Sequence, residues 1–378
     1  MDKKDEILIL FDGPHLAYSP TITQLYDALS KDFLVTILAE KGKGFIEQAL
    51  TGYNVIYYQT KRKKPTFIYK SWYFLLSLVN SEVKYLRSNK IKFPEYFYRF
   101  RFIKTILQEG KYRRIIAVDN KNLFYCSMLN IPVDFLSLEL GLAEKSLPLV
   151  ETGLINCIII QTKERLDYLF KGEKIRTFYI QNAPVYRDLI PPATKKGLLF
   201  GGTAWDAFGI YHCLNYLKTY KDEILTVQGA IPPADEKRIE NEYKDLLSEK
   251  RLVIPRKYLE NDQVVDYFSQ FEIGFCFYNF NLDWVNHFNY KSAPSGKLFK
   301  YLAAGVPVVA IDITGFAFVK EFKCGVLIKD ISPQKIREAI IQIRNNYDDY
   351  TANAIAAAKH FSFDKMVKPY IDFVKEVK

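Results

Sequence analysis

One short segment of the chain combines the residue types that bind an anion. Pro294, Ser295 and Gly296 directly precede an apolar repeat of helical spacing, and Lys297 is the next residue. A serine can cap a helix, a glycine lets a ligand approach the backbone, and the first amides of a helix attract negative charge. The segment therefore predicts a phosphate or diphosphate site, the alternative being an ordinary capped helix with a solvated lysine. Gly305 is expected to end this helix.

Two further loops in the same half of the chain stand where strand-to-helix loops with chemical roles are expected. Both follow short apolar runs that are typical of strands, and in parallel sheets such loops lie at the edge where ligands bind. The first loop holds Gly201, Gly202 and Thr203, and the second holds Arg256 between a proline and a lysine. Either loop could instead have this composition for reasons of folding alone.

Acidic side chains and a histidine follow strand-like runs in the first half of the chain. Asp12, Gly13 and His15 come after the first run, and Asp119 and Glu139 follow later ones. Such side chains could orient or deprotonate a substrate hydroxyl, so Asp119, Glu139 and His15 are the catalytic candidates. Asp12 and Gly13 would form a loop on the side of this hydroxyl, here called the acceptor side. The alternatives are a plain strand-to-helix turn and, for Asp119, a helix cap.

The elements that must position these residues alternate between short apolar runs and longer stretches of helical spacing. The runs are nearly all apolar, as expected of parallel strands that helices cover on both faces. This alternation predicts an α/β protein built from repeated βαβ units. The expected strands cover residues 7–11, 33–38, 55–58, 114–118, 133–138, 157–160, 177–180, 197–200, 224–227, 252–254, 273–277, 306–311 and 326–328.

A linker is expected near the middle of the chain. The stretch from Asn182 to Lys196 is rich in proline and short polar residues, which favours a break between two domains. We expect an N-terminal domain over residues 1–185 and a C-terminal, ligand-binding domain over 186–348. Residues 349–378 are expected to form helices that cross back to the N-terminal domain.

The composition is that of a globular protein, and it disfavours several other classes. The 378 residues are 49% hydrophobic and 25% charged, which suffices for two domains with cores. No apolar run approaches the ~18 residues of a membrane-spanning helix, and the first residues lack the apolar stretch of a signal peptide. Five cysteines without a CxxC pair and four scattered histidines favour a cytoplasmic protein with no metal site.

The positive charge is concentrated in one segment of the N-terminal half. The chain has a net charge of +10, whereas residues 61–114 alone hold 15 lysines and arginines against 3 glutamates. The same segment is rich in aromatic residues, a combination that favours docking on an anionic membrane surface. The alternatives are core helices with basic outer faces and, less favoured, nucleic-acid binding. The proposed membrane patch consists of Lys61, Arg62, Lys63, Lys64 and Trp72.

The segment from Pro294 to Val309, PSGKLFKYLAAGVPVV, resembles the C-terminal signature of GT-B glycosyltransferases, particularly the retaining, family 4-like group. The segments GLLFGGT (197–203), LTVQG (225–229) and LVIPRKYL (252–259) resemble the strands and loops that precede that signature. The resemblance covers about residues 195–345, and over the N-terminal half it is architectural only. It implies a GT-B fold, in which two Rossmann-like domains with doubly wound parallel sheets face a central cleft.

The resemblance also implies roles for individual residues. Pro294, Ser295, Gly296 and Lys297 would face the diphosphate of the donor, and Arg256 would border the base. At Gly201, Gly202 and Thr203 the backbone would approach either the same phosphates or the acceptor side. One departure concerns Lys300, because the family usually has there a glutamate that holds ribose hydroxyls. The acidic residue typical of the position eight residues earlier is replaced by Ser292, and the loop after Gly202 lacks the usual basic residues. Lys300 could help Lys297 with the phosphates, and Asp283 or Asp312 could supply the missing carboxylate.

The sequence thus predicts a glycosyltransferase that moves a sugar from a nucleotide diphosphate sugar to a glycan or lipid-linked acceptor. The resemblance implies a retaining reaction in which the donor phosphate assists, and no cofactor or metal is expected. Bacterial cell-envelope polysaccharide synthesis is the expected setting, at the cytoplasmic face of the plasma membrane. The main alternative is a non-catalytic GT-B scaffold at the membrane surface. A GT-B sugar epimerase is less favoured, because a cleft rich in carboxylates and histidine is not evident.

Overall fold

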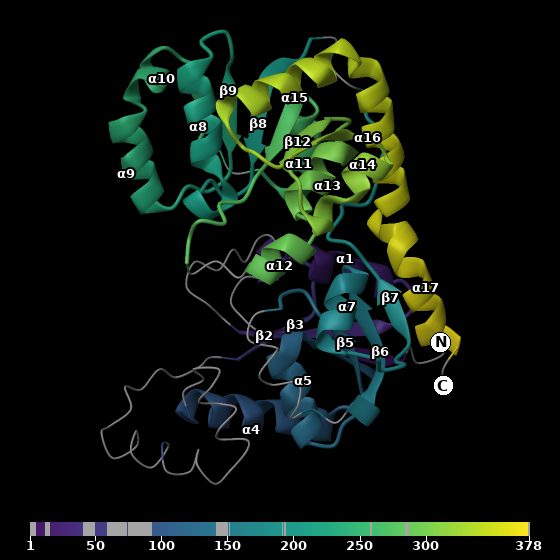
Figure 1. Cartoon of the computed structure of the whole chain (residues 1–378). Helices are drawn as coiled ribbons and strands as arrows, with labels where there is room; N and C mark the ends of the chain where they lie inside the picture. Colours follow the sequence, from purple (N-terminus) through teal and green to yellow (C-terminus); the bar gives the residue numbers. More distant parts are fainter. Residues whose placement is uncertain are drawn as a thin grey trace. The chain divides into compact units, whose positions relative to one another are not determined.

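The computed structural model describes residues 5–11, 16–40, 50–58, 74, 93–140, 150, 152–190, 192, 194–257, 259–283 and 287–376. The chain divides into two compact units. Unit 1 consists of Met1–Ile180 with Val367–Lys378, and unit 2 consists of Gln181–Met366. Each unit contains its own parallel β-sheet with helices (Figure 1).

Unit 1 contains a seven-stranded parallel sheet with the order β3-β2-β1-β4-β5-β6-β7. Its strands are β1 (Glu6–Leu10), β2 (Leu34–Glu40), β3 (Val55–Tyr58), β4 (Tyr112–Val118), β5 (Val133–Leu136), β6 (Ile155–Ile160) and β7 (Thr177–Tyr179). Its described helices are η1 (Leu16–Tyr18), α1 (Pro20–Leu29), α4 (Phe93–Glu109), α5 (Asp119–Met128), η4 (Thr152–Leu154) and α7 (Lys163–Leu169). Helix α17 (Phe363–Glu376) contributes its residues from Val367 onward to this unit.

Unit 2 contains a six-stranded parallel sheet with the order β10-β9-β8-β11-β12-β13. Its strands are β8 (Lys196–Gly201), β9 (Leu225–Gln228), β10 (Leu252–Val253), β11 (Phe271–Cys276), β12 (Val308–Ile311) and β13 (Gly325–Ile328). Its helices are η5 (Asp206–Phe208), α8 (Ile210–Thr219), α9 (Pro233–Glu242), α10 (Lys244–Ser248), α11 (Asn261–Phe268), α12 (His287–Ser292), α13 (Gly296–Ala303), η6 (Thr314–Phe316), α14 (Phe318–Glu321), α15 (Pro333–Asn345) and α16 (Tyr347–Phe361).

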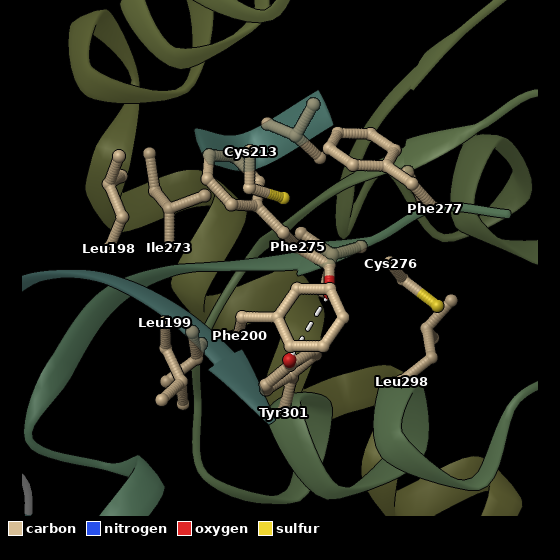
Figure 2. Packing of buried hydrophobic residues seen from close by; sticks show 14 of the residues in the cluster. Leu198, Leu199, Phe200, Cys213, Ile273, Phe275, Cys276, Phe277, Leu298 and Tyr301 are labelled. Atoms are coloured by element: carbon tan, nitrogen blue, oxygen red, sulfur yellow. Dashed lines mark hydrogen bonds between the residues drawn. The ribbon is translucent and has the colours of Figure 1, made fainter. Parts of the chain in front are cut away.

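Helices cover both faces of the unit 2 sheet. Helices α8, α9 and α10 gather on one side, whereas α11, α13 and α16 lie on the other (Figure 1). Helix α13 packs against α11 and α16, and α15 packs against α8. Burial on both faces explains why the strand residues are nearly all apolar, since neither face meets water. The core between the layers includes Phe200, Phe275, Leu298 and Tyr301 (Figure 2).

The structure confirms the predicted α/β class with two Rossmann-like parallel sheets. Each of the thirteen expected strands overlaps one of the thirteen strands found among the described residues. All the strand pairings given for these residues are parallel, as the apolar runs predicted. The apolar pattern alone was sufficient to predict the strands, because strands that helices cover on both faces are apolar along nearly their whole length.

Candidate functional site

The loops that hold the C-terminal candidates share one edge of the unit 2 sheet. The strand order of this sheet reverses direction between β8 and β11. In open parallel sheets, ligands bind outside the carboxyl ends of the strands at this switch point. Gly201, Gly202 and Thr203 lie at the end of β8, and Pro294–Lys297 follows β11 by way of α12. The fold therefore places residues about 90 positions apart at the same switch point.

Helix α13 begins where the sequence predicts. Ser295 is the N-cap residue, although its side chain caps no backbone amide, and Gly296 is the first helical residue. Pro294 is buried just before them. Within the described part of the chain, no acceptor pairs with the amides of Gly296 and Lys297. These two N–H groups and the positive end of the helix dipole are therefore available to an anion.

The ammonium group of Lys297 is buried and has no hydrogen-bond partner among the described residues. Its Nζ lies 4.2 Å from the ring centre of Phe200 and 5.2 Å from that of Phe208. Burial lowers the pKa of this amine below its ordinary value. A buried cation without an anionic partner is costly, so this group favours an anion from outside the chain.

A tyrosine hydroxyl connects α13 to the glycine turn. The Oη of Tyr301 accepts a hydrogen bond from the Gly201 amide at 2.6 Å. It also donates one to the Phe275 carbonyl at 3.2 Å (Figure 2). Gly202 follows with a φ of +88°, and no atom lies within 4 Å of where a side chain would begin. The sequence does not predict this role of Tyr301, because a tyrosine on an apolar helix face indicates packing alone.

Aromatic side chains surround the buried ammonium at this edge of the sheet. Trp205 and Phe208 stack with ring centres 5.5 Å apart and planes at 21°. Phe208 also meets the edges of Tyr278 and Tyr290, each at 5.9 Å. Tyr278 stacks on Phe316 of η6, the short helix after β12. The loop GGTAWDAFG carries two of these rings, but no motif in the sequence predicts the cluster.

The other donor-side candidates have different surroundings. Arg256 forms ion pairs with Glu236 at 2.7 Å and Glu240 at 3.2 Å, both on α9. Lys300 is largely buried, which lowers its pKa, and no described residue bonds to its amine. Asp312 pairs with Lys320 at 2.9 Å. Asp283 is exposed, and the structure assigns no ligand role to any of these carboxylates.

Unit 1 brings two of the catalytic candidates together. Its strand order reverses between β1 and β4, and Asp119 follows β4 directly. The Oδ1 of Asp119 accepts hydrogen bonds from the amides of Leu138 at 2.8 Å and Glu139 at 3.0 Å. Asp119 thus holds the loop after the neighbouring strand β5, and Val118 is the N-cap of α5 instead. The side chain of Glu139 itself is exposed.

Several candidates lie outside the described residues. They are Asp12, Gly13 and His15 of the acceptor-side loop and Lys61, Arg62, Lys63, Lys64 and Trp72 of the membrane patch. In the part of the chain that the structure describes, no group of three His, Cys, Asp or Glu side chains is suited to a metal ion. No helix formed by the described residues is long and apolar enough to span a membrane.

Comparisons with known proteins show the fold of the chain. No family model matches it, and no curated protein does. Sucrose-phosphate synthase from Thermosynechococcus elongatus matches with a TM-score of 0.68 at 14% identity over 99% of both chains. An E. coli trehalose-6-phosphate protein bound with UDP-2-fluoro glucose matches with a TM-score of 0.63 at 11% identity, over 99% of this chain and 100% of the other. A Listeria monocytogenes protein assigned as a UDP-N-acetylglucosamine 2-epimerase has a TM-score of 0.59 at 11% identity over 99% and 98% of the two chains.

At these identities the likeness establishes the architecture and leaves the activity open. The chain has the fold of the GT-B glycosyltransferases, with two Rossmann-like units, as the segment from Pro294 to Val309 predicted. The narrower resemblance, to the family 4-like group, stays a prediction because no family model matches.

Proposed function

We propose that the chain is a glycosyltransferase that transfers a sugar from a nucleotide diphosphate sugar to a glycan or lipid-linked acceptor. The reaction would retain the anomeric configuration and need no metal. The proposed setting is the synthesis of bacterial cell-envelope polysaccharides. Structural neighbours with names such as sucrose-phosphate synthase, and one bound with UDP-2-fluoro glucose, support a sugar-transfer role.

The observation that carries this proposal is the unpartnered ammonium of Lys297 at the start of α13. A diphosphate there would meet the Gly296 and Lys297 amides and the helix dipole, and it would compensate the buried charge. These groups would stabilise the departing nucleotide diphosphate, which is the main electrostatic requirement of the transfer. The open turn at Gly202 would let the backbone approach the same ligand.

In this proposal, the acceptor hydroxyl is activated from unit 1. Asp119 is tied to two backbone amides, so it would position the loop that carries Glu139. The exposed carboxylate of Glu139 would orient or deprotonate the acceptor hydroxyl. Asp12, Gly13 and His15 would complete the acceptor side.

The test is a single substitution at the buried ammonium. Lys297→Met keeps the length and packing of the side chain but removes its charge. We expect UDP and GDP, measured by isothermal titration calorimetry with the full-length protein, to bind about ten- to hundredfold more weakly. The free energy of unfolding should stay the same or rise, because an uncompensated buried charge is removed.

The control is Lys335→Met, which removes the same charge from an exposed pair with Glu338 on α15. It should leave nucleotide binding unchanged, since exposed ion pairs contribute little. Unchanged nucleotide binding by Lys297→Met would contradict the proposed phosphate site. If none of UDP, GDP, UDP-glucose and GDP-mannose stabilises the wild-type protein in a thermal-shift assay, the non-catalytic scaffold becomes the better account.

We further propose that the enzyme docks on an anionic membrane through the segment 61–114, from the cytoplasmic side. The support is its excess of basic residues and its aromatic content. Vesicles containing phosphatidylglycerol should bind the protein, whereas phosphatidylcholine vesicles should not, and salt should weaken the binding. Changing Lys61, Arg62, Lys63 and Lys64 to glutamine should reduce it. Equal binding to both kinds of vesicle would contradict the electrostatic docking.

A further inference from the structure

A buried arginine holds the loop that carries Glu139. Arg165 lies in the first turn of α7, the helix that follows β6, and its side chain is fully buried. Its Nη1 donates hydrogen bonds to the Leu138 carbonyl and to Gln161 Oε1, both at 2.7 Å. A guanidinium is costly to remove from water unless hydrogen bonds compensate the loss. These contacts tie the start of α7 to the loop after the neighbouring strand β5.

The peptide group between Leu138 and Glu139 is held at both of its polar atoms. Its carbonyl accepts from Arg165, and its N–H, which belongs to Glu139, donates to Asp119 Oδ1 at 3.0 Å. The preceding peptide group is fixed as well, since the Leu138 amide donates to the same carboxylate oxygen at 2.8 Å. A peptide group bonded in this way cannot rotate without losing a hydrogen bond. The direction in which the Glu139 side chain leaves the backbone is therefore set.

Asp119 holds this loop from the other side and has an unusual backbone conformation. Its φ of +57° lies in the left-handed region, which residues other than glycine seldom adopt. Strain of this kind is concentrated at functional sites, where surrounding contacts keep it in place. Asp119 follows β4 and Arg165 follows β6, and β5 lies between these two strands in the sheet. The loop after β5 is thus held from both neighbouring strands.

We propose that Arg165 is a positioning residue for the carboxylate of Glu139. It fixes the peptide group next to Glu139, and thereby the place of the exposed carboxylate at the carboxyl edge of the unit 1 sheet. This inference rests on the proposed function, in which that carboxylate orients or deprotonates the acceptor hydroxyl. Such a role depends on precise placement, because a displacement of about 1 Å can lower a rate about a hundredfold.

The experiment measures hydrolysis of the donor, in which water takes the place of the acceptor. Release of nucleoside diphosphate from UDP-glucose, UDP-galactose, UDP-N-acetylglucosamine and GDP-mannose identifies the donor that the full-length wild-type protein uses. With that donor, we expect Arg165→Met to lower kcat about ten- to hundredfold and to leave KM unchanged. Arg165→Lys should recover part of kcat, because an ammonium can still donate to the Leu138 carbonyl.

A double variant tests whether Arg165 acts through Glu139. Glu139→Gln removes the carboxylate that is positioned, so the addition of Arg165→Met should lower kcat no further. A residue that only supported the fold would instead lower the kcat of Glu139→Gln by the same factor as that of wild type. If Arg165→Met does not fold, Arg165→Lys takes its place in the same comparison.

Arg113→Met is the matched control. Arg113 also donates to two backbone carbonyls of unit 1, but it lies on β4 at the amino end of the sheet. This variant should keep the kcat and KM of wild type. A second measurement is hydrogen exchange of the Leu138 and Glu139 amides, which should be faster in Arg165→Met than in wild type or in Arg113→Met.

The outcomes separate this inference from the proposed function. An unchanged kcat in Arg165→Met, losses that multiply in the double variant, or unchanged exchange of the two amides would each overturn the inference. In all three cases the phosphate site at Lys297 would stand. A wild-type protein that neither binds nor hydrolyses any of the four nucleotide sugars would instead overturn the proposed function.

Discussion

The candidate site depends on Lys297, and the charge of this residue depends on pH. Burial favours the neutral amine, so its pKa lies below the ordinary value of 10.5. The two neighbouring thiols stay protonated, because burial raises the pKa of both Cys213 and Cys276. The charge of Lys297 is therefore lost as the pH rises through a pKa that lies below 10.5.

The first prediction concerns the pH dependence of nucleotide binding. A diphosphate prefers the protonated amine, so affinity for UDP should be highest below the lowered pKa of Lys297 and fall as the pH rises through it, before pH 10.5. Calorimetry across this range measures the effect. Lys297→Arg should remove the decline, because guanidinium stays charged throughout. A wild-type decline that persists in Lys297→Arg would assign the titration to another group.

At the scale of the element, α13 matters because both of its ends are well defined. At its C-terminal end, the Gly305 amide donates to the Leu302 carbonyl and the Val306 amide donates to the Tyr301 carbonyl, both at 2.9 Å. Gly305 has a φ of +65°. This is the Schellman arrangement, in which a glycine in the left-handed region ends the helix as predicted. It also fixes the backbone just after Tyr301, whose hydroxyl holds the glycine turn.

The second prediction tests this helix end. Gly305→Ala should lower the free energy of unfolding by about 1–2 kcal/mol, because an L-residue is strained in the left-handed region. The added methyl group itself finds space, since its nearest neighbour is Ile355 at 3.5 Å. Denaturant titration measures the loss.

Gly153→Ala is the control for this prediction. Gly153 has no positive φ, and no atom lies within 4 Å of an added methyl group. Its substitution should therefore not be destabilising. An equal loss in both variants would mean that the conformation of Gly305 is not the cause.

At the scale of the whole molecule, the last helix returns the chain to unit 1. The hydroxyl of Tyr370 donates to Asp134 Oδ2 at 2.9 Å, and both residues are fully buried. Arg114 donates to the other oxygen of Asp134 at 3.2 Å. Arg113 also donates to the carbonyls of Val374 and Lys375, each at 3.0 Å. Tyr370, Asp134 and Arg114 thus form one buried network inside unit 1, although Tyr370 lies more than 230 positions after Asp134.

The third prediction tests that network. Tyr370→Phe should lower the free energy of unfolding by about 1–3 kcal/mol, because it removes a partner from a buried carboxylate. Tyr53→Phe is the matched control, since the Tyr53 hydroxyl also donates to a carboxylate of unit 1, that of Asp27, but at an exposed site. Tyr53→Phe should lower the free energy of unfolding much less in the same denaturant titration. Comparable decreases in the two variants would show that burial of Asp134 does not determine the loss of stability.

The fold and the start of the candidate site follow from local patterns in the sequence. The apolar runs predicted every described strand, and the residues from Pro294 to Gly305 predicted the limits of α13. Such patterns are local: strand and helix periodicity, a capping position and a terminal glycine depend on neighbours within a few residues.

Only the tertiary structure decided which side chains meet. It buried the ammonium of Lys297 against Phe200 and Phe208, and it joined Tyr301 to Gly201 and Asp119 to the Glu139 amide. These partners lie between 20 and 100 positions apart in the chain. Their contacts arise from strand order and from layer packing, which no local repeat of residue types encodes. The elements therefore follow from the sequence, whereas the site follows from how a parallel sheet brings the ends of its strands together.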